Sequence, residues 1–386
     1  MIDRHNRIRP VTYGLALYFF LAVADVVTLG ALGSLLKIIA VIPLVLSVLD
    51  IRRMRIRFDM LIVVQLLFLL LAVFSIFYSI MQSRTISSVS TLMLNLVLVM
   101  VLGSVQVYNE AEVKFLYRSM LLGSWLTVAL ILCFSGIASD GRLTLQLGEG
   151  SHDQNLLNGY TLFAFSHHCN AALLQRKWKH FPAALLLLGI VLLTGSRGAL
   201  VAYAVVALMY LALLMRSSHN PLRNTLILLV VTVLAAVFWE ILMAQMPPAV
   251  AERFSWDYIA QYGTTGRTKI WRYLWNHFCD DTTARMFFGH GYGTTAIVNQ
   301  RNHLVAHNLY LDNLITLGII GVTLQIITQA CVLRELARQK ATAVLGAYLG
   351  MIVLCLSLSL TAAKLIWNIV LLTLIMRYRL TEEKVV

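Results

Sequence analysis

The chain has 386 residues, of which 59% are hydrophobic and 13% are charged, whereas an average soluble domain has roughly 45–50% and 25%. This composition excludes an ordinary soluble protein. The five cysteines form no CxxC pair and no metal-ligand spacing, which excludes a disulfide-rich scaffold and a cysteine-based metal centre. The net charge of +13 is expected to anchor loops at an anionic membrane surface, and we expect no nucleic-acid partner.

Apolar windows of about 20 residues, the length needed to span a bilayer, occur twelve times along the chain. They cover residues 11–29, 32–50, 60–80, 87–106, 119–138, 159–174, 181–196, 198–215, 225–246, 307–330, 342–360 and 362–378. The residues before the first window are short and polar, and the window has no small-residue cleavage site, so we expect the first helix to be retained. The sequence predicts an all-α polytopic membrane protein with about 12 transmembrane helices.

The distribution of basic residues indicates the orientation of these helices. With a cytoplasmic N-terminus, the cytoplasmic loops carry 20 of the 31 Lys and Arg residues and the external side carries 10. Arg52, Arg53, Arg55 and Arg57 in one short loop contribute most clearly. The positive-inside rule then predicts a multi-pass membrane protein with both termini in the cytoplasm.

One connection is far longer than the others. Residues 247–306 form an external loop with many aromatic and apolar residues, which argue against disorder. The chain therefore divides into transmembrane helices 1–9 (1–246), an external loop with short helices (247–306), and transmembrane helices 10–12 with a cytoplasmic tail (307–386). A smaller external loop covers residues 139–158 and is rich in Gly, Asn, Asp and Gln.

Ionisable residues inside apolar windows are costly and are functional candidates by default. For Asp25, Lys37 and Glu240 we favour a polar contact between helices or a position at the membrane interface, because several such residues lie near helix ends. His167 and His168 lie in the cytoplasmic half of their window, and a structural role is favoured for both.

Arg197 has an unusual setting in Thr194-Gly195-Ser196-Arg197-Gly198, which joins two apolar helices on the external side. Glycine permits a tight turn there. The following helix would present its N-terminal amides beside the guanidinium, an arrangement suited to binding phosphate. An ordinary interfacial arginine remains the alternative.

Arg267 occupies a comparable position in the long loop. A helix is predicted from there to His277, with aromatic residues at helical spacing that are more typical of packing against the bilayer than of sugar binding. Gly289-His290-Gly291-Tyr292-Gly293 follows. It resembles a phosphate-binding loop only superficially, because the strand and helix that a nucleotide fold requires are missing.

His307 and Asn308 begin the tenth apolar window, followed by nine residues and then Gly318-Ile319-Ile320-Gly321. This spacing predicts an imidazole at the external end of a helix that packs closely through glycine one or two turns deeper. Because its pKa is near neutral, such a histidine could act as general base toward a sugar hydroxyl. Anchoring of the helix at the interface is the alternative role.

These motifs together resemble the bacterial O-antigen ligase and O-antigen polymerase superfamily of membrane glycan transferases. The resemblance covers the topology, the full His307-Asn308-x9-Gly318-x2-Gly321 signature, the arginine of Ser196-Arg197-Gly198 and the loop arginine of Gly266-Arg267. Asp153-Gln154-Asn155 is similar to the Asp-Pro-Asn of many polymerase-like members, with Gln154 in place of proline.

The resemblance implies a GT-C-like fold and an inverting, metal-independent glycosyltransferase without a cofactor. Its donor would be an undecaprenyl-pyrophosphate-linked oligosaccharide, and its active site would face the external side. His307, Arg267 and Arg197 are the implied catalytic residues. The substrate-binding residues would be the two arginines together with Asn308, Gly291, Gly293, Asp153 and Asn155.

The acceptor distinguishes two functions within this superfamily. A surface-polysaccharide or O-antigen polymerase, which we slightly favour, extends a second lipid-linked glycan, whereas an O-antigen ligase transfers the glycan to lipid A-core. A chain-length regulator is a further candidate partner. A transporter or flippase of lipid-linked glycans is the alternative from another class. It would require polar groups along a path through the membrane, and the windows at 60–80, 87–106 and 119–138 contain almost no charged residues.

Overall fold

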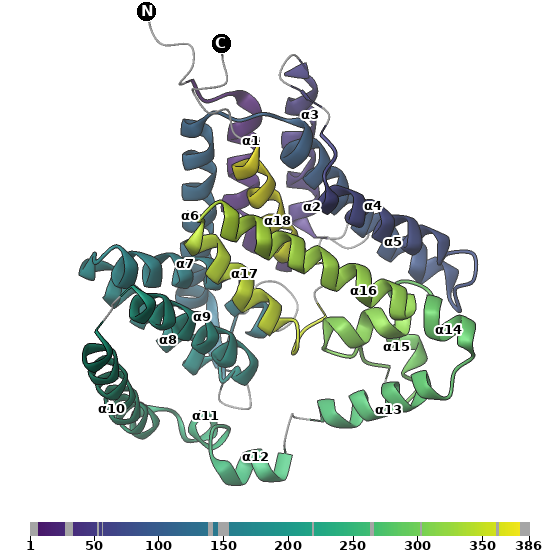
Figure 1. Cartoon of the computed structure of the whole chain (residues 1–386). Helices are drawn as coiled ribbons and strands as arrows, with labels where there is room; N and C mark the ends of the chain where they lie inside the picture. The colour runs from purple at the N-terminus through teal and green to yellow at the C-terminus, as the bar shows by residue number, and fades with distance from the viewer. Residues whose placement is uncertain are drawn as a thin grey trace, which may run out of the picture.

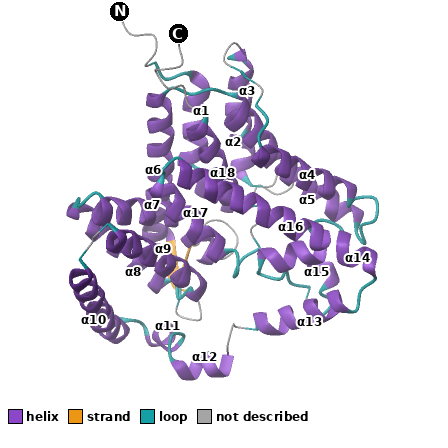
Figure 2. Cartoon of the chain, viewed as in Figure 1, coloured by secondary structure: helices purple, strands orange, loops and turns teal. Residues whose placement is uncertain are grey.

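The computed structural model describes residues 7–27, 34–51, 54–55, 57–137, 142–145, 154–217, 220–262, 266–301, 303–359 and 363–378. Nearly all regular structure in these residues is helical, and two short strands form one antiparallel hairpin (Figure 2). The structure therefore agrees with the predicted all-α class.

The first half of the chain contains helices and the hairpin. In chain order these are α1 (Pro10–Phe20), the 3₁₀ helix η2 (Ala22–Val26), α2 (Leu35–Ile39), α3 (Val41–Val48), α4 (Met60–Phe74), α5 (Gln82–Leu98), the π-helix η5 (Val99–Val105), α6 (Glu110–Phe134), β1 (Ser135–Ile137), β2 (Leu143–Leu145), α7 (Gln154–Cys169), the π-helix η6 (Asn170–Leu174) and the 3₁₀ helix η7 (Trp178–His180).

The second half contains two kinds of helix, long apolar ones and the short ones of the long loop. They are α8 (Phe181–Leu193), α9 (Arg197–Arg216), α10 (Pro221–Gln245), α11 (Pro248–Glu252), α12 (Trp256–Tyr262), α13 (Arg267–Cys279), α14 (Thr283–Phe288), α15 (Thr295–Val298), α16 (Leu309–Arg338), α17 (Thr342–Leu354) and α18 (Lys364–Arg377).

Every apolar window contains helix, although the helix ends differ from the window ends. Within the described residues, four segments are long and apolar enough to cross a membrane: Gln82–Val105, Glu110–Phe134, Arg197–Arg216 and Leu309–Arg338. Shorter apolar helices accompany them. These are the helices of an all-α membrane protein, and the number of twelve crossings stays a prediction.

Helix starts follow local capping chemistry. Asn109 and Glu112 form a reciprocal capping box that begins α6, about nine residues before the apolar window. Asp59 caps α4 by accepting a hydrogen bond from the Ile62 amide at 3.0 Å. A hydropathy window cannot detect such polar first turns, because it counts only apolar residues.

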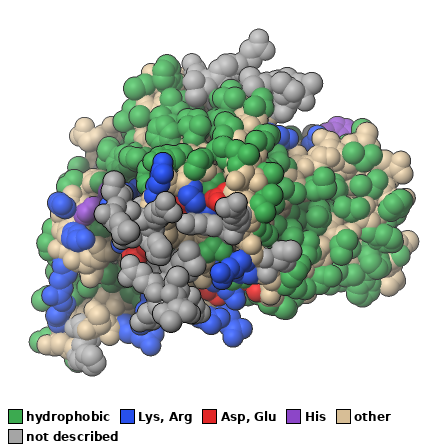
Figure 3. Space-filling view, turned by 90° about the horizontal axis from the view of Figure 1, so that it is seen from above, with side chains coloured by type: hydrophobic (Ala, Val, Ile, Leu, Met, Phe, Trp, Pro, Cys, Tyr) green, Lys and Arg blue, Asp and Glu red, His purple; other side chains and the backbone are tan. Residues whose placement is uncertain are grey.

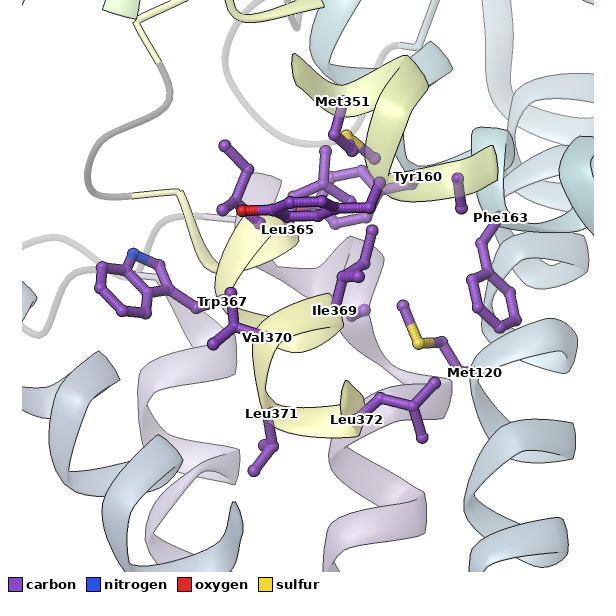
Figure 4. Packing of buried hydrophobic residues seen from close by; sticks show 14 of the residues in the cluster. Met120, Tyr160, Phe163, Met351, Leu365, Trp367, Ile369, Val370, Leu371 and Leu372 are labelled. Atoms are coloured by element: carbon purple, nitrogen blue, oxygen red, sulfur yellow. The ribbon is translucent and has the colours of Figure 1, made fainter. Parts of the chain in front are cut away.

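The core lies where α6, α7, α17 and α18 meet. Figure 4 shows side chains from all four helices, among them Met120, Phe163, Met351 and Leu372, converging around α18. α1 packs on α6, and α17 packs on both α7 and α9. Close helix contacts depend on small residues: an added Cβ at Gly123 would lie 2.5 Å from the Phe19 carbonyl oxygen.

A buried ion pair connects distant parts of this core. Lys364, 1% exposed at the start of α18, donates to Asp25 at 2.5 Å and to Ser34 at 3.0 Å. Tyr160 donates to the other Asp25 oxygen at 3.3 Å. Asp25 therefore has the predicted role of a polar contact between helices, and Lys37, which donates to Thr91 at 3.1 Å, has a similar one.

Large hydrophobic side chains also cover much of the surface. Leu70 and Phe74 on α4 and Leu226 and Leu229 on α10 are each more than half exposed. Figure 3, which looks onto the molecule from above, shows a broad hydrophobic area beside a zone of Lys and Arg side chains. Such extensive apolar exposure is typical of a surface that contacts lipid.

The long loop forms the end of the molecule opposite the labels of the two chain ends, where α11, α12 and α13 follow one another along the edge (Figure 1). Above them, α16 is broken at Gly318, which has a φ of 66° and a ψ of -164°. The sequence predicted a continuous helix here. The break brings the carbonyl groups of residues 315 and 316 into contact with the long loop.

Candidate functional site

The turn between α8 and α9 places Arg197 at the first position of a helix, as the sequence predicted. Gly195 has a φ of 60°, and the Ser196 side chain caps α9 by accepting from the Ala199 amide at 3.3 Å. Asn158 holds the turn from α7 by donating to Thr194 at 2.8 Å. The half-buried Arg197 guanidinium thus lies at the positive end of the α9 dipole.

Two further arginines gather around this turn. Arg253, the C-terminal cap of α11, donates to the Gly195 carbonyl oxygen at 3.4 Å. Arg142 packs so closely that its side chain would lie 3.1 Å from a Cβ at Gly195. Tyr258 of α12 lies beneath two of the guanidinium groups, 5.8 Å from Arg197 and 5.9 Å from Arg253. The concentration of positive charge suits a polyanionic ligand such as pyrophosphate.

Asn155 lies at the same helix start. Its side-chain oxygen accepts a hydrogen bond from the Ser196 hydroxyl and would lie 3.4 Å from a Cβ on Gly198. The structure therefore brings Asn155 next to Arg197, from a segment about forty residues away in the chain. Asp153 lies outside the described residues.

Arg267 begins α13, as predicted, after Gly266 with a φ of 85°. The helix buries Ile270 and Leu274 against a small cluster that includes Ala306 and Ile315. Trp271 donates from its indole nitrogen to the Ala306 carbonyl oxygen at 2.7 Å. The apolar face of α13 thus packs on the start of α16 and fixes the residue that precedes His307.

The His307-Asn308 pair forms the entrance to α16. Asn308 is the N-cap, and its side chain accepts from the amides of Tyr310 and Leu311, both at 3.0 Å. His307 is half-buried and has a left-handed backbone with a φ of 49°, which is uncommon outside glycine. The buried Asp312 accepts from the Ala306 amide at 3.1 Å. Hydrogen bonds to the Asp312 and Asn308 side chains therefore fix the backbone on both sides of His307.

The segment after α17 lies between the entrance to α16 and the arginine cluster. The Leu309 amide donates to the Cys355 carbonyl at 2.8 Å, and Asn308 donates to the Leu356 carbonyl at 3.3 Å. The next residue, Ser357, is so close to α9 that its hydroxyl would lie 2.3 Å from a Cβ at Gly198. The turn formed by residues 355–357 thus contacts both the start of α16 at Asn308 and the start of α9 at Gly198.

An open groove of about 360 Å³ lies between α13 and the start of α16. Its lining residues are Thr268, Trp271, Arg272, Trp275, Asn308 and Leu311. Trp275 is 53% exposed, so its ring is available for contact with a ligand. Aromatic rings beside polar groups are suited to a sugar or to the first part of a lipid chain.

The glycine-rich stretch has a packing role. An added Cβ at Gly289 would lie 2.3 Å from the Thr316 backbone, and one at Gly318 would lie 2.3 Å from the Phe287 backbone. The amides of His290 and Gly291 donate to the carbonyls of residues 315 and 316, both at 3.0 Å. The stretch therefore donates hydrogen bonds to carbonyl groups that lose their helical partners at the break in α16.

Gly291 and Gly293 also have positive φ angles, of 109° and 82°. They face Ser79 and Ser88, whose hydroxyl groups would be within 2.4 Å and 2.1 Å of an added Cβ. These contacts account for glycine at both positions, and binding of substrate by either residue stays a prediction.

Two groups of side chains in the described residues could hold a metal ion: His167 with His168 and His180, and His277 with Asp281 and His290. His290 is 3% exposed and lies 3.0 Å from Asp281. Burial lowers the pKa of the His290 imidazole, although the Ile315 carbonyl and the Asp281 carboxylate oppose this shift.

Sequence reasoning missed Arg142 and Arg253 in the arginine cluster, and it did not join His277, Asp281 and His290 into one group. The two arginines could have been selected from the predicted topology, which placed them on the same side as Arg197. Their convergence on Gly195 depends on tertiary contacts between three separate segments, for which the sequence contains no local signal.

Comparison with known families supports the resemblance seen in the sequence. Residues 182–326 match the family model described as O-antigen ligase. The matched segment runs from α8 to the middle of α16 and includes Arg197, Arg267 and His307. No curated protein matches the chain. The resemblance to the O-antigen ligase and polymerase superfamily is thereby confirmed for this segment.

Proposed function

We propose that the protein transfers an undecaprenyl-pyrophosphate-linked oligosaccharide to an acceptor hydroxyl at the external face of the bacterial inner membrane. The match of residues 182–326 to the O-antigen ligase family model supports this reaction class. The observation that supports this most is the arginine cluster of Arg142, Arg197 and Arg253 at the start of α9, one backbone segment away from His307-Asn308.

The arginine cluster is the proposed pyrophosphate site. When the anomeric carbon is attacked, its bond to the phosphate oxygen breaks and the electron pair leaves with the pyrophosphate. Guanidinium groups stabilise this growing negative charge and need no metal ion to do so. Arg267 is proposed to bind the same leaving group. It begins α13, the helix that follows α12 in the chain, and Tyr258 of α12 lies under Arg197.

His307 is the proposed general base. The acceptor oxygen forms the new bond to the anomeric carbon from the side opposite the leaving group, so the configuration inverts, and the hydroxyl proton passes to the imidazole. Asp312 is a positioning residue in this scheme, because it fixes the Ala306 amide next to His307. Asn308 holds the start of the helix, and the adjacent groove receives part of a substrate.

We favour a surface-polysaccharide polymerase over a ligase that uses lipid A-core. The experiment that distinguishes them is electrophoretic and mass analysis of lipid-linked glycans in cells with and without the gene. Loss of a polymerase leaves single repeat units on the acceptor, whereas loss of a ligase leaves long polymer on undecaprenyl pyrophosphate.

The same cells test the transporter alternative. If the protein were a flippase, its absence would retain single lipid-linked units on the cytoplasmic side, where an added membrane-impermeant glycosidase cannot reach them in intact spheroplasts. That result would refute the transferase proposal.

A further inference from the structure

His277, Asp281 and His290 converge at the junction of α13, α14 and the broken part of α16. The two imidazole Nε2 atoms are 3.3 Å apart, and Asp281 Oδ2 lies 3.0 Å from His290 and 4.0 Å from His277. Three potential ligand atoms from two separate segments thus face a common point.

The orientation of the His290 ring directs its Nε2 atom toward Asp281 Oδ2 and His277 Nε2. Its Nδ1 lies 3.1 Å from the Ile315 carbonyl oxygen, and because a carbonyl only accepts, Nδ1 must carry the proton of that hydrogen bond. A backbone carbonyl that holds one ring nitrogen in this way is the usual support for a metal-binding histidine, because it fixes the tautomer and the ring direction.

Asp281 provides a second, independent observation. Its Oδ1 accepts from the Thr282 amide at 3.2 Å, but its buried Oδ2 receives no hydrogen bond among the described residues. A carboxylate oxygen that accepts no hydrogen bond and faces two imidazole nitrogens is suited to binding a cation between them.

The distances fit a small transition-metal ion. Ligand bonds of roughly 2.0–2.1 Å in a tetrahedron place neighbouring ligand atoms about 3.3 Å apart, close to the distances in this cluster. Two imidazoles and one carboxylate are the donors that Zn²⁺ accepts readily, whereas Mg²⁺ and Ca²⁺ prefer oxygen ligands throughout. The His277 side chain is 39% exposed, so a water molecule can reach the fourth position.

We propose that His277, Asp281 and His290 bind one Zn²⁺ ion that joins the end of α13 to the break in α16. This site is separate from the proposed chemistry: His277 lies ten residues after Arg267 on one helix, a separation of about 15 Å. The ion would fix the C-terminal end of the helix whose first residue is Arg267.

The second histidine group is a natural control, because each of its rings already has a hydrogen-bond partner within the protein. Trp125 donates to His168 Nε2 at 3.2 Å, which leaves His168 Nδ1 to donate to His180 at 2.9 Å. His167 pairs with the Tyr117 hydroxyl at 2.8 Å. No cation is needed to satisfy these atoms.

The test is a Zn²⁺ titration of the purified full-length protein in nanodiscs, with the affinity tag removed, monitored by calorimetry and by metal analysis after desalting. We expect one Zn²⁺ per chain in the wild type. Asp281→Asn and His277→Gln, which are both at partly accessible positions, should weaken binding at least about 100-fold, whereas His180→Gln should bind like the wild type.

Thermal unfolding gives a readout that does not depend on transfer activity. Added Zn²⁺ should raise the unfolding midpoint of the wild type and of His180→Gln but not that of Asp281→Asn. The proposal is overturned if the wild type binds no stoichiometric Zn²⁺, if Asp281→Asn binds as tightly as the wild type, or if binding is lost in His180→Gln instead. None of these results depends on the proposed transfer reaction.

Discussion

Replacing Arg197 by alanine tests the proposed pyrophosphate site. The backbone should tolerate the change, because Ser196 still caps α9 and alanine is the best helix former. Loss of one preorganised donor to a developing charge usually costs about 2.7–4 kcal/mol. Arg142 and Arg253 remain nearby and Arg197 is only half-buried, so we expect a smaller loss of about 2–3 kcal/mol, a fall in transfer rate on the order of 30–150-fold.

The assay is single-turnover transfer by purified variants from a lipid-linked donor. Arg197→Lys should recover only part of the rate, because an ammonium lacks the planar fork of a guanidinium. The matched control is Arg216→Ala at the exposed opposite end of the same helix, about 28 Å away. Equal rates in Arg197→Ala and Arg216→Ala would refute the pyrophosphate site.

Three further predictions concern the fold and the metal requirement. Gly318→Ala should destabilise the protein by about 2–4 kcal/mol in thermal or denaturant unfolding, because a φ of 66° is unfavourable for alanine and the added Cβ would lie 2.3 Å from the Phe287 backbone. Gly189→Ala on α8, which has open space around it, should not destabilise the protein. Equal stability of the two variants would contradict the close contact between Gly318 and the Phe287 backbone. Asp25→Asn or Lys364→Met alone should cost about 3–5 kcal/mol and the double variant less; no loss in either single variant would show that the ion pair does not contribute. In Asp281→Asn, which lacks the proposed Zn²⁺ site, removal of divalent ions with EDTA should not change the transfer rate, because the proposed catalytic groups are arginines and an imidazole. A rate that is lost with EDTA in this variant and restored only by an added ion would contradict this chemistry.

The sequence predicted the parts of this fold that depend on local pattern. Apolar windows identify helices because a segment that spans lipid must be helical and predominantly apolar. The start of α9 at Arg197 and that of α13 at Arg267 were also predicted, since glycine and a following apolar period mark a helix start locally.

The break in α16 could not be predicted, because glycine is compatible with both a helix and a kink. What selects the kink is the Phe287 backbone, which lies against Gly318, and the amides of His290 and Gly291, which take up the freed carbonyls. The His277 group escaped detection for a similar reason. Its members lie on a helix, in a turn and in the glycine-rich stretch, and only the packing of α13 and α14 on α16 brings them together.

The proposed role of His307 as general base is the central claim, and His303 provides the most direct comparison. Both histidines have left-handed backbones, with φ angles of 49° and 55°, so alanine carries a similar conformational cost at each position. The decisive measurement is single-turnover transfer by His307→Ala and His303→Ala, with donor affinity measured in parallel. We expect His307→Ala to lose roughly 100- to 10,000-fold in rate while donor binding persists, and His303→Ala to stay near the wild type. Equally small losses in both variants would contradict the claim and would leave His307 with the role of anchoring α16.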